Sequence, residues 1–475
     1  MAATSYWRGK RVTVMGLGVL GGGVGAARYL ASHGALVTVT DTRDAESLAD
    51  SVAALDGLPI TFHLGRHDRN DFTSANADVV VRNPGVPMDS PYLKAARDSG
   101  IPIEMEMSIF FRDCPAPIIG VTGTKGKTTV SALIGCILHA WNPDSMLAGN
   151  MGISALMKLD RLTLETPVAL ELSSFQIESL NDHRLSPHVA VITNIFPDHL
   201  DRYRDFEHYA ATKRGLTRVM RPDDVVVYNV GDPESSRVVE ETRARRFPFG
   251  LGQPHEDGAW GIGEDLVLVD GAMRMTFERP GVLALAGNHG ASNALAAVAA
   301  AHAYDVPEWA IAEGLRSFTG VENRLDVVTE IGGVTYVNDT SATAPAAAIA
   351  GVRVLAPRAK TLRLIAGGAD KRTDLTPFAD ELRSRNVKVY LLEGSATPTL
   401  RTLIAERRVA ISGTFDSMAA AVRAAAGDAE PGDLVALCPA CASFGMFRNE
   451  FDRGEQFRAA VSTLDVNREE QEKEL

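Results

Sequence analysis

Short apolar runs alternate with helical or glycine- and proline-rich segments along the whole chain. Near the N-terminus these runs are Val12–Met15, Val37–Thr40 and Val79–Val81. Apolar runs this short, separated by helical segments, are typical of the buried strands of parallel sheets. The pattern therefore predicts an α/β fold built on parallel sheets.

The alternation is interrupted at two places. Pro115-Ala-Pro117 precedes a new apolar run at Ile118–Val121, and near Gly320 the stretch "VENRLDVVTEIGGVTYVNDT" predicts a pair of strands. Later runs are Leu362–Ile365, Val387–Leu392 and Leu434–Leu437. A chain of 475 residues is also too long for one core. We predict three domains over residues 1–113, 114–320 and 321–475, and a frayed charged tail, "NREEQEKEL".

The stretch "VTVMGLGVLGGGVG", Val12–Gly25, joins the first apolar run to a helical segment through several glycines. Glycines there let backbone N–H groups approach a pyrophosphate at the positive end of a helix. Asp41 ends the next run, at the distance where an acidic residue accepts hydrogen bonds from a ribose or a base. This Rossmann-like opening predicts a diphosphate site, and it leaves open whether the ligand is a nicotinamide coenzyme or another nucleotide.

A second glycine loop, "GVTGTKGKTT", covers Gly120–Thr129 and again joins an apolar run to a helical segment. Its spacing departs from the Walker pattern, because Val121 stands where the first glycine is required. Backbone amides can still surround a phosphate here, while Lys127 reaches the β/γ oxygens and Thr128 ligates Mg²⁺. The loop predicts a central mononucleotide-binding domain with its own phosphate site.

Composition excludes several classes of partner. The formal charge is −12, whereas nucleic-acid binding requires a basic footprint. No apolar run approaches the ~20 residues of a membrane helix, and the N-terminal "MAATSYWRGK" has no signal-peptide core. We expect a cytoplasmic protein with no nucleic-acid or membrane partner.

The four cysteines are too few to crosslink a chain of this length. Cys438-Pro-Ala-Cys441 has the C-x-x-C spacing of a redox or zinc motif, but no second pair completes a metal site. We interpret it as two small buried thiols in the turn after Leu434–Leu437.

The second loop, Gly123-Thr-Lys-Gly-Lys-Thr-Thr129, resembles that of the Mur ligase family of peptidoglycan synthesis and of its folylpolyglutamate synthase and cyanophycin synthetase relatives. Later motifs resemble the member that adds D-glutamate to UDP-N-acetylmuramoyl-L-alanine. They are "ELSSFQIE" (Glu171–Glu178), "ITNIFPDHLDRY" (Ile192–Tyr203), "YAATK" (Tyr209–Lys213), "NDTSAT" (Asn338–Thr343) and "CPACASFGMF" (Cys438–Phe447). The resemblance spans almost the whole chain and implies three domains: a Rossmann-like N-terminal domain, a central P-loop domain and a Rossmann-like C-terminal α/β domain.

The resemblance also implies a reaction. ATP phosphorylates the alanine carboxylate of the precursor, and the amine of glutamate attacks the acyl phosphate. Bringing a carboxylate to a triphosphate is costly at ~4 Å unless cations offset the repulsion. Lys127 and Thr128 are placed in the sequence to do so. The first glycine loop then holds the UDP diphosphate rather than a coenzyme.

Residue roles follow from the resemblance alone. Implied ATP contacts are Gly123, Thr124, Lys125, Gly126, Lys127, Thr128, Thr129, Asn293, Arg324 and Asp339. Implied precursor contacts are Gly18, Val19, Leu20, Asp41, Thr42, Gly85, Asn150, Ser173 and Gln176. Implied contacts of the added amino acid are Thr343, Lys371, Ser443 and Phe444. Implied catalytic residues are Lys127, Glu171, His199 and Lys213.

Glu171 ends the apolar run Val168–Leu170, and His199 follows the run Val189–Ile192. Both can therefore project from the carboxyl edge of one sheet and hold Mg²⁺. Lys213 lies in a charged helical segment, where a solvated cation is the default. The resemblance instead implies a carbamylated Lys213. With Thr128, Glu171 and His199 it would complete two Mg²⁺ sites, in an enzyme that acts as a monomer.

The sequence departs from the family pattern at three positions. Gly290 stands where an asparagine of the adenine segment is usual, Ser341 replaces a lysine, and Glu450 occupies an aromatic position. We expect Glu450 to face solvent and Phe451 to take the aromatic place. These departures lie in the base and amino-acid segments, so the identity and hand of the amino acid are less determined than the reaction.

Three alternatives stay open. A sister ligase would add L-glutamate or another amino acid. Folylpolyglutamate synthases do not normally begin with a complete Rossmann-like domain, which argues against them. An oxidoreductase or a non-catalytic nucleotide-binding protein would need Gly16–Gly25 to bind a dinucleotide and Lys127 to be idle, and added NADH would reveal it by fluorescence transfer.

Overall fold

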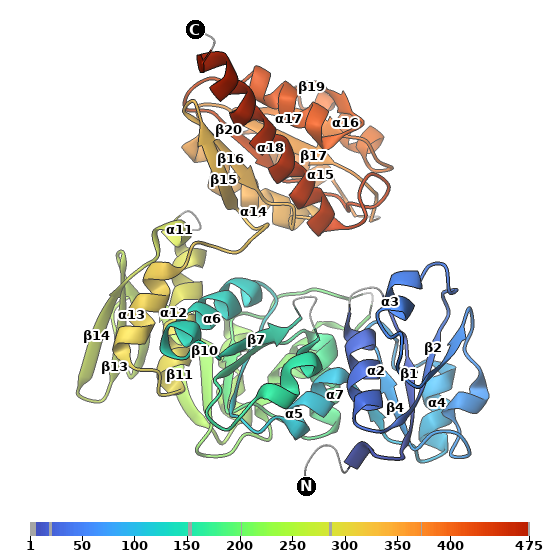
Figure 1. Ribbon diagram of the computed structural model, residues 1–475. Coiled ribbons are helices and arrows are strands. Elements are labelled where there is room, and N and C mark those ends of the chain that lie inside the picture. The colour runs from blue at the N-terminus through green and yellow to red at the C-terminus, as the bar shows by residue number, and fades with distance from the viewer. Residues whose placement is uncertain are drawn as a thin grey trace. The chain divides into compact units, whose positions relative to one another are not determined.

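The computed structural model describes residues 6–18, 21–150, 154–200, 202–284, 287–371 and 373–473. Within these ranges the strands form three sheets, and the chain forms two compact units (Figure 1). The first unit ends at Phe318 and contains two of the sheets. The second unit runs from Thr319 onward and contains the third sheet.

The first sheet is parallel throughout, in the order β3 (Ile60–Leu64), β2 (Leu36–Asp41), β1 (Arg11–Met15), β4 (Val79–Arg82) and β5 (Ile103–Glu104). Its helices are α2 (Gly22–Ser32), α3 (Ala49–Ala53), η1 (Arg69–Phe72), α4 (Pro91–Asp98) and α5 (Glu106–Asp113). Val14 is buried between Val39 and Val81. The chain changes direction across the sheet at β1 and β4, so the loops that follow these two strands form a switch point suited to a ligand.

The second sheet has the order β14 (Met273–Glu278), β13 (Asp265–Asp270), β12 (Gly258–Ile262), β11 (Arg245–Leu251), β10 (Val225–Asn229), β9 (Val189–Ile192), β6 (Ile118–Thr122), β8 (Val168–Glu171) and β7 (Met146–Gly149). It is parallel from β7 to β12 and antiparallel from β12 to β14. Its helices are α6 (Lys127–Trp141), η2 (Ala155–Arg161), α7 (Ser174–Asp182), α8 (Phe206–Arg214), η3 (Gly215–Thr217), α9 (Pro233–Ser236), α10 (Val238–Glu241), α11 (Gly281–Ala284), α12 (Gly287–Ala303) and α13 (Glu308–Ser317).

The first two sheets share one apolar core. Val14 of β1, Leu170 of β8 and Ile192 of β9 belong to the same buried cluster, and α5 packs against α7 between the two sheets (Figure 1). Burial of a continuous apolar surface stabilises the arrangement of the two sheets. The strand ends of both sheets are therefore held in fixed positions within the first unit.

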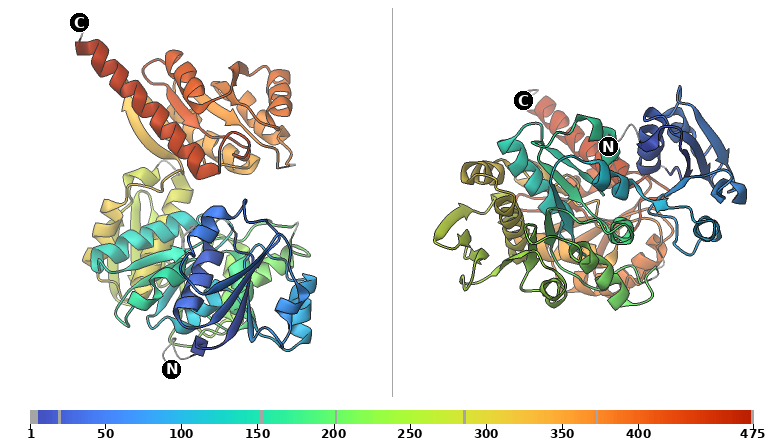
Figure 2. Two further views of the ribbon diagram at one scale, coloured as in Figure 1. Left: turned by 45° about the vertical axis from the view of Figure 1, so that its right-hand side comes forward. Right: turned by 90° about the horizontal axis from the view of Figure 1, so that it is seen from below.

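The third sheet, in the second unit, has the order β15 (Asp326–Ile331), β16 (Val334–Asn338), β20 (Leu434–Leu437), β17 (Leu362–Gly367), β18 (Val387–Leu392) and β19 (Ala410–Phe415). Within this sheet, among the described residues, only the β15–β16 pair is antiparallel. Its helices are α14 (Pro345–Leu355), η4 (Ala356–Arg358), α15 (Thr376–Arg383), α16 (Thr397–Glu406), α17 (Met418–Gly427) and α18 (Glu450–Lys473). Figure 2 shows α18 as a long helix along one side of this sheet.

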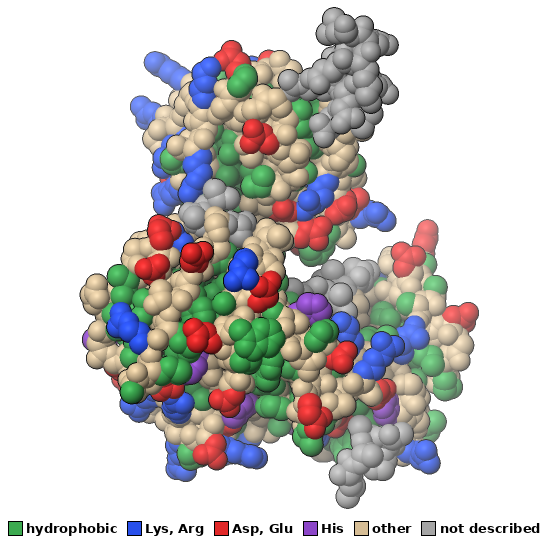
Figure 3. Space-filling view, turned by 60° about the vertical axis from the view of Figure 1, so that its left-hand side comes forward, with side chains coloured by type: hydrophobic (Ala, Val, Ile, Leu, Met, Phe, Trp, Pro, Cys, Tyr) green, Lys and Arg blue, Asp and Glu red, His purple; other side chains and the backbone are tan. Residues whose placement is uncertain are grey.

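The predicted apolar runs are confirmed as strands, including β18 and β20 at their predicted bounds. The predicted frayed tail is wrong, because α18 continues to Lys473. The antiparallel β12–β14 segment was not predicted. No helix in the described ranges is long and apolar enough to cross a membrane. Acidic and basic side chains are interspersed over the face in Figure 3.

Candidate functional site

The second glycine loop lies between β6 and α6, as predicted. Gly126 precedes α6 in the left-handed region, with φ of 85°, and a Cβ there would lie 2.5 Å from Asn293 Oδ1. A Cβ on Gly123 would lie 1.9 Å from Thr193 Oγ1. Both glycines are therefore required by backbone conformation or close approach. The structure also brings Asn293, from α12, against this loop.

Lys127 is the first residue of α6 and folds back over the loop. Its Nζ donates hydrogen bonds of 3.0 Å to the carbonyl oxygens of Gly123 and Thr124. An ammonium group at the N-terminus of a helix adds its charge to the helix dipole and the free backbone amides. The loop therefore has the electrostatics of a phosphate site.

Glu171 ends β8 and is buried, with 2% of its surface exposed. Its Oε1 accepts a hydrogen bond of 3.0 Å from Asn150 Nδ2. Its Oε2 is buried with no hydrogen-bond partner among the residues that the structure describes. A buried carboxylate oxygen without a partner is unusual, and a hard cation would satisfy it.

His199 lies in the turn after β9 with φ of 53°, a conformation that few non-glycine residues adopt. Its ring centroid is 5.0 Å from that of Phe175 and 6.2 Å from that of Tyr209. Tyr209 in turn donates to or accepts from Thr124 Oγ1 at 3.1 Å. The His199 turn is thus packed against the phosphate loop through Tyr209.

Lys213 is buried, so the default of a solvated cation is wrong at this position. Its Nζ donates to the carbonyl oxygen of Gly123 at 2.9 Å and lies 5.0 Å from the Tyr209 ring centroid. Burial lowers the pKa of Lys213 well below its usual value, and the charge of Lys127 lowers it further. The carboxylates of Asp198 and Glu171 act in the opposite direction.

Tyr209 was not among the sequence-predicted site residues, although it packs between His199 and Lys213. It precedes Lys213 by four residues on α8, so both side chains lie on the same face of that helix. That spacing is the signal by which it could have been found.

No group of three or more His, Cys, Asp or Glu side chains with metal-site geometry occurs in the part of the chain that the structure describes. Glu171 and His199 alone do not form such a group. The predicted metal set therefore depends on Thr128, which is half-buried, and on a modified Lys213. The unpartnered Oε2 of Glu171 is the observation that fits a cation.

The first glycine loop contacts Asp41, while the predicted role of Asp41 toward a ribose or base stays a prediction. The backbone N–H of Gly18 donates to Asp41 Oδ2 at 3.2 Å, and that of Arg43 donates to Oδ1 at 3.0 Å. Thr42 is exposed beside them, and Gly85 lies in the loop after β4. Val19 and Leu20 lie outside the described residues.

Ser173 and Gln176, two predicted precursor contacts, form the N-terminal cap of α7. Gln176 Oε1 accepts from the backbone N–H of Ser173 at 2.9 Å, and Ser173 Oγ accepts from that of Gln176 at 3.3 Å. This is a capping box. Their side chains thereby order the start of the helix that follows Glu171.

In the second unit, Asp339 follows β16 and is buried. Its Oδ1 accepts from the backbone N–H of Leu325 at 3.2 Å, and its Oδ2 accepts from Cys438 Sγ at 3.4 Å. Burial raises the pKa of Asp339 to about 7, while these hydrogen bonds and the charge of Arg324 lower it. Arg324 is thus within electrostatic reach of Asp339.

The two C-x-x-C cysteines are buried and free, as interpreted from the sequence. Cys438 follows β20, and burial raises its pKa well above the usual value. A thiol in this state is a weak nucleophile and a poor metal ligand. Its hydrogen bond to Asp339 indicates a structural role.

The predicted amino-acid contacts come partly together. Lys371 Nζ donates to Thr343 Oγ1 at 3.0 Å. A backbone bridge between Ala369 and Ala442 brings the strand end before Lys371 beside the segment that leads to Ser443. Ser443 is buried, whereas Phe444 is 62% exposed.

The expectation that Glu450 faces solvent is wrong. Glu450 is half-buried, and its charge raises the pKa values of Lys371 and Arg453 against the lowering by burial. Phe451 instead is 52% exposed. The reason is that Glu450 is the first residue of α18, within electrostatic reach of Lys371 and of Arg453 on the same helix.

Three family models match the chain in order. They describe a Mur ligase MurD-like N-terminal domain at residues 10–104, a Mur ligase middle domain at 121–301 and a Mur ligase glutamate ligase domain at 323–441. These ranges contain the first and third sheets and all but the first residues of the second sheet and of its glycine loop. The chain belongs to the Mur ligase family.

Individual proteins of this family are similar to the chain over nearly its whole length. The chain is 47% identical over 467 residues to the UDP-N-acetylmuramoylalanine–D-glutamate ligase of Roseiflexus sp., covering 96% of this chain and 99% of that protein. It is 39% identical over 464 residues to the protein of the same name from Anaeromyxobacter dehalogenans, covering 95% and 97%. The crystal structure of UDP-N-acetylmuramate-alanine ligase from Thermotoga maritima matches with a TM-score of 0.60 and 18% identity over 96% of this chain and 99% of that one, which shows the shared fold.

Proposed function

We propose that the protein is an ATP-dependent, ADP-forming ligase that adds D-glutamate to UDP-N-acetylmuramoyl-L-alanine in peptidoglycan precursor synthesis. The relatives of the same length carry that activity in their names. The structural observation that carries the proposal is the contact of the buried Lys213 with the phosphate loop at Gly123. A plain nucleotide-binding protein has no need of a buried lysine there.

ATP would lie on the second glycine loop. The loop contacts are Gly123, Thr124, Lys125, Gly126, Lys127, Thr128 and Thr129, and Asn293, Arg324 and Asp339 would bind the nucleoside. The position of Asn293 against Gly126 supports its place beside the bound nucleotide. Lys127 would leave the carbonyl oxygens it now contacts and bind the β/γ-phosphates, where one cation stabilises the charge that develops in phosphoryl transfer.

Magnesium would be held by Thr128, Glu171, His199 and the carbamylated Lys213. Bound there, it would offset the charge between the triphosphate and the precursor carboxylate. The unpartnered Oε2 of Glu171 supports the first site. Asn150 would orient the same carboxylate through its hydrogen bond to Oε1.

Carbamylation of Lys213 would convert a buried cation into an anion. The ammonium first loses one proton, and the neutral amine nitrogen then bonds to the carbon of CO₂ and loses a second proton to solvent. The ammonium form is costly in this buried place beside Lys127, whereas a carbamate beside metal ions is stabilised. This chemistry supports a second Mg²⁺ site between the phosphate loop and α8.

The precursor would bind the first loop and Gly18, Val19, Leu20, Asp41, Thr42, Gly85, Asn150, Ser173 and Gln176. Glutamate would bind Thr343, Lys371, Ser443 and Phe444. The hydrogen bond between Lys371 and Thr343 supports an anion site there, because both groups can donate to a carboxylate. We place domain boundaries at 113/114 and 320/321, and the working form as a cytoplasmic monomer.

Phosphate release from ATP tests the proposal. The purified protein is incubated with ATP, Mg²⁺, UDP-N-acetylmuramoyl-L-alanine and a panel of D- and L-amino acids. We expect release only with the full set and with D-glutamate as the best acceptor. Release with L-glutamate or a neutral amino acid instead would keep the ligase chemistry and reject the D-glutamate assignment.

A further inference from the structure

Glu178, on α7, joins two loops that come from different sheets. Its Oε2 accepts hydrogen bonds from Arg82 Nη2 at 2.7 Å and from Arg202 Nη2 at 3.2 Å. Its Oε1 accepts from the Tyr203 hydroxyl at 2.9 Å. One carboxylate therefore contacts the end of β4 in the first sheet and the turn after β9 in the second.

Arg82 ties Glu178 to the loop after β4. Its side chain is only 1% exposed, and its Nη1 donates to the carbonyl oxygen of Val86 at 3.1 Å. Asn83, the next residue, packs against the first glycine loop, since a Cβ on Gly16 would lie 3.0 Å from Asn83 Cβ. A buried guanidinium needs its carboxylate partner, so the position of this loop depends on Glu178.

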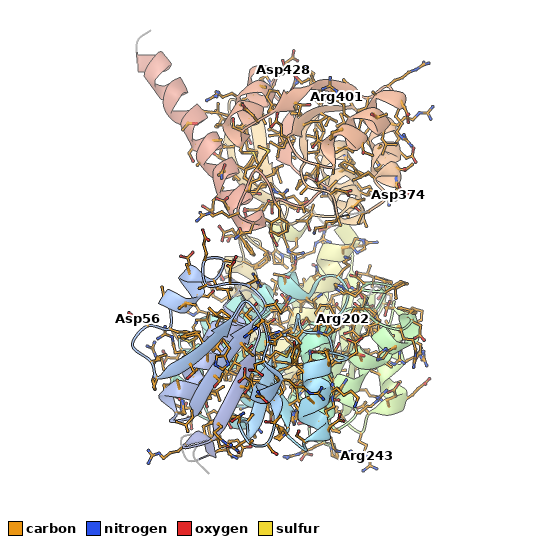
Figure 4. The ribbon with its side chains drawn as sticks, turned by 90° about the vertical axis from the view of Figure 1, so that its right-hand side faces the viewer. Asp56, Arg202, Arg243, Asp374, Arg401 and Asp428 are labelled. Carbon is orange, nitrogen blue, oxygen red and sulfur yellow. The ribbon has the colours of Figure 1, made fainter. Side chains whose placement is uncertain are left out.

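Arg202 and Tyr203 tie the same carboxylate to the His199 turn. Both backbone N–H groups donate to the carbonyl oxygen of His199 at 3.0 Å. The Arg202 guanidinium, labelled in Figure 4, lies 4.1 Å from the Phe175 ring centroid, and its Nη1 donates to the carbonyl oxygen of Pro84 at 2.8 Å. The side chains of Arg202 and Tyr203 are therefore anchored on α7, and Arg202 also on the loop after β4.

This arrangement does more than fill a core. His199 holds an unfavourable backbone conformation, with φ of 53°. Such a residue keeps its geometry only where the surroundings determine it. The residues that fix its carbonyl oxygen, Arg202 and Tyr203, are themselves held by Glu178. The Glu178 carboxylate is thus connected to the proposed metal ligand through Arg202 and Tyr203, and to the proposed precursor loop through Arg82.

We propose that Glu178 is a positioning residue that sets the geometry of the precursor loop at 83–86 and of the His199 turn together. The inference rests on the proposed function for the names of the two subsites. It extends it by assigning a residue that contacts neither substrate nor metal. Loss of Glu178 would loosen both subsites at once, whereas loss of the Arg82 guanidinium or of the Tyr203 hydroxyl would loosen one.

Four variants separate the arms. Glu178→Gln keeps the shape and removes the charge. Arg82→Gln removes the link to the precursor loop only, and Tyr203→Phe removes one hydroxyl on the His199 side only. Asp182→Asn is the matched control, because Asp182 lies one turn along α7, is exposed, and acts on Arg82 only through its charge.

Two measurements read the two subsites. Calorimetry without ATP and Mg²⁺ gives the Kd of UDP-N-acetylmuramoyl-L-alanine, and turnover against Mg²⁺ concentration gives the half-saturating Mg²⁺. We expect Glu178→Gln to raise both by about five- to tenfold, the loss of one or two charged hydrogen bonds. Arg82→Gln should raise only the precursor Kd, Tyr203→Phe only the half-saturating Mg²⁺, and Asp182→Asn neither.

Hydrogen exchange of the ligand-free protein tests the inference without any substrate. Glu178→Gln should speed exchange in the peptides that contain residues 83–86 and 199–203 while exchange in β6 stays at the wild-type rate. Exchange at the wild-type rate in both peptides, or faster exchange over the whole first unit, would overturn the inference. Wild-type protein that fails to turn over D-glutamate would instead reject the proposed function and leave the exchange result to decide the role of Glu178.

Discussion

The two glycine loops of the first unit share a backbone design and differ in what surrounds them. Each joins a buried parallel strand to a helix whose N-cap glycine is left-handed, Gly21 in one and Gly126 in the other. The stretch Gly16–Gly25 contains no lysine, arginine or histidine. The second loop has Lys127 folded over it and Lys213 beneath it.

The difference separates binding from chemistry. The first loop offers backbone amides and the Asp41 carboxylate, which suit the fixed diphosphate and base of a nucleotide. The second adds cations and the unpartnered carboxylate oxygen of Glu171, which suit charge that changes during a reaction. Glycine spacing alone reports a phosphate, and the neighbouring side chains determine whether it is held or transferred.

We expect the largest effect from a substitution that impairs the second loop and leaves the first loop unchanged. Lys127→Ala should lower phosphate release by about a thousandfold or more, because a cation at the transferring phosphoryl group contributes several kcal/mol to the transition state. Precursor Kd at the first loop should stay within twofold by calorimetry. Lys158→Ala, an exposed lysine on η2, is the control and should match wild type. Near-normal release by Lys127→Ala would remove ATP from this loop.

A substitution of Lys213 tests the buried lysine that distinguishes the second loop from the first. Lys213→Ala should lose about a hundredfold or more in turnover and regain part of it in added acetate or formate, because a small carboxylate can occupy the place of the carbamate. Rate against carboxylate concentration is the measurement. Recovery in methylamine and none in acetate would show that an ordinary ammonium acts there.

A substitution at the first loop should instead weaken precursor binding and leave ATP binding unchanged. Asp41→Asn weakens the acceptor that receives the Gly18 and Arg43 backbone N–H groups. We expect the precursor KM to rise about tenfold, as for a charge-assisted hydrogen bond, with the ATP KM unchanged. A rise in both constants would contradict the division of labour between the loops.

The affinity for ATP should depend on pH through the ionisation of Asp339. Its pKa, raised to about 7 by burial, leaves the carboxyl neutral at pH 6 and ionised at pH 8. An ionised acceptor binds a ribose hydroxyl more tightly, so the ATP Kd should fall severalfold over that range. Asp339→Asn should flatten the profile, measured by calorimetry in matched buffers.

The same shift affects folding. Because the folded pKa of Asp339 lies above its unfolded value, the folded state is favoured at low pH and loses stability as pH rises from about 4 to about 7. Asp339→Asn should remove this loss. Thermal unfolding of the ligand-free protein at pH 5 and pH 8 would show a smaller difference in Tm for the variant.

The smallest expected effect concerns glutamate. Glu450→Gln removes a negative charge that acts on Lys371, so the glutamate KM should fall two- to fivefold while the ATP KM is unchanged. Steady-state kinetics at fixed ionic strength measures it. An increase in the glutamate KM would mean that Glu450 holds Lys371 in place rather than competing for it.

Much of the fold and part of the site could be read from local pattern. Apolar runs predicted several strands in each of the three sheets, and Gly126 with Lys127 predicted the phosphate loop, because strand burial and loop conformation depend on neighbours in sequence. The β12–β14 segment was missed because its antiparallel pairing lacks the helical spacing that marked the other strands. The role of Glu178 could not be predicted from sequence, because its partners Arg82, Arg202 and Tyr203 are distant in the chain.

The sequence by itself determined the alternation of strands and helices, the two glycine loops and the resemblance that implies a ligase. Only the tertiary structure decided the environment of individual charges. It buried Lys213 against Gly123, left Glu171 Oε2 without a hydrogen-bond partner among the described residues, and placed the half-buried Glu450 where its charge acts on Lys371. The electrostatic free energy of each charged group depends on its desolvation and on its distance from groups far apart in sequence. Neither quantity is defined until the chain is folded.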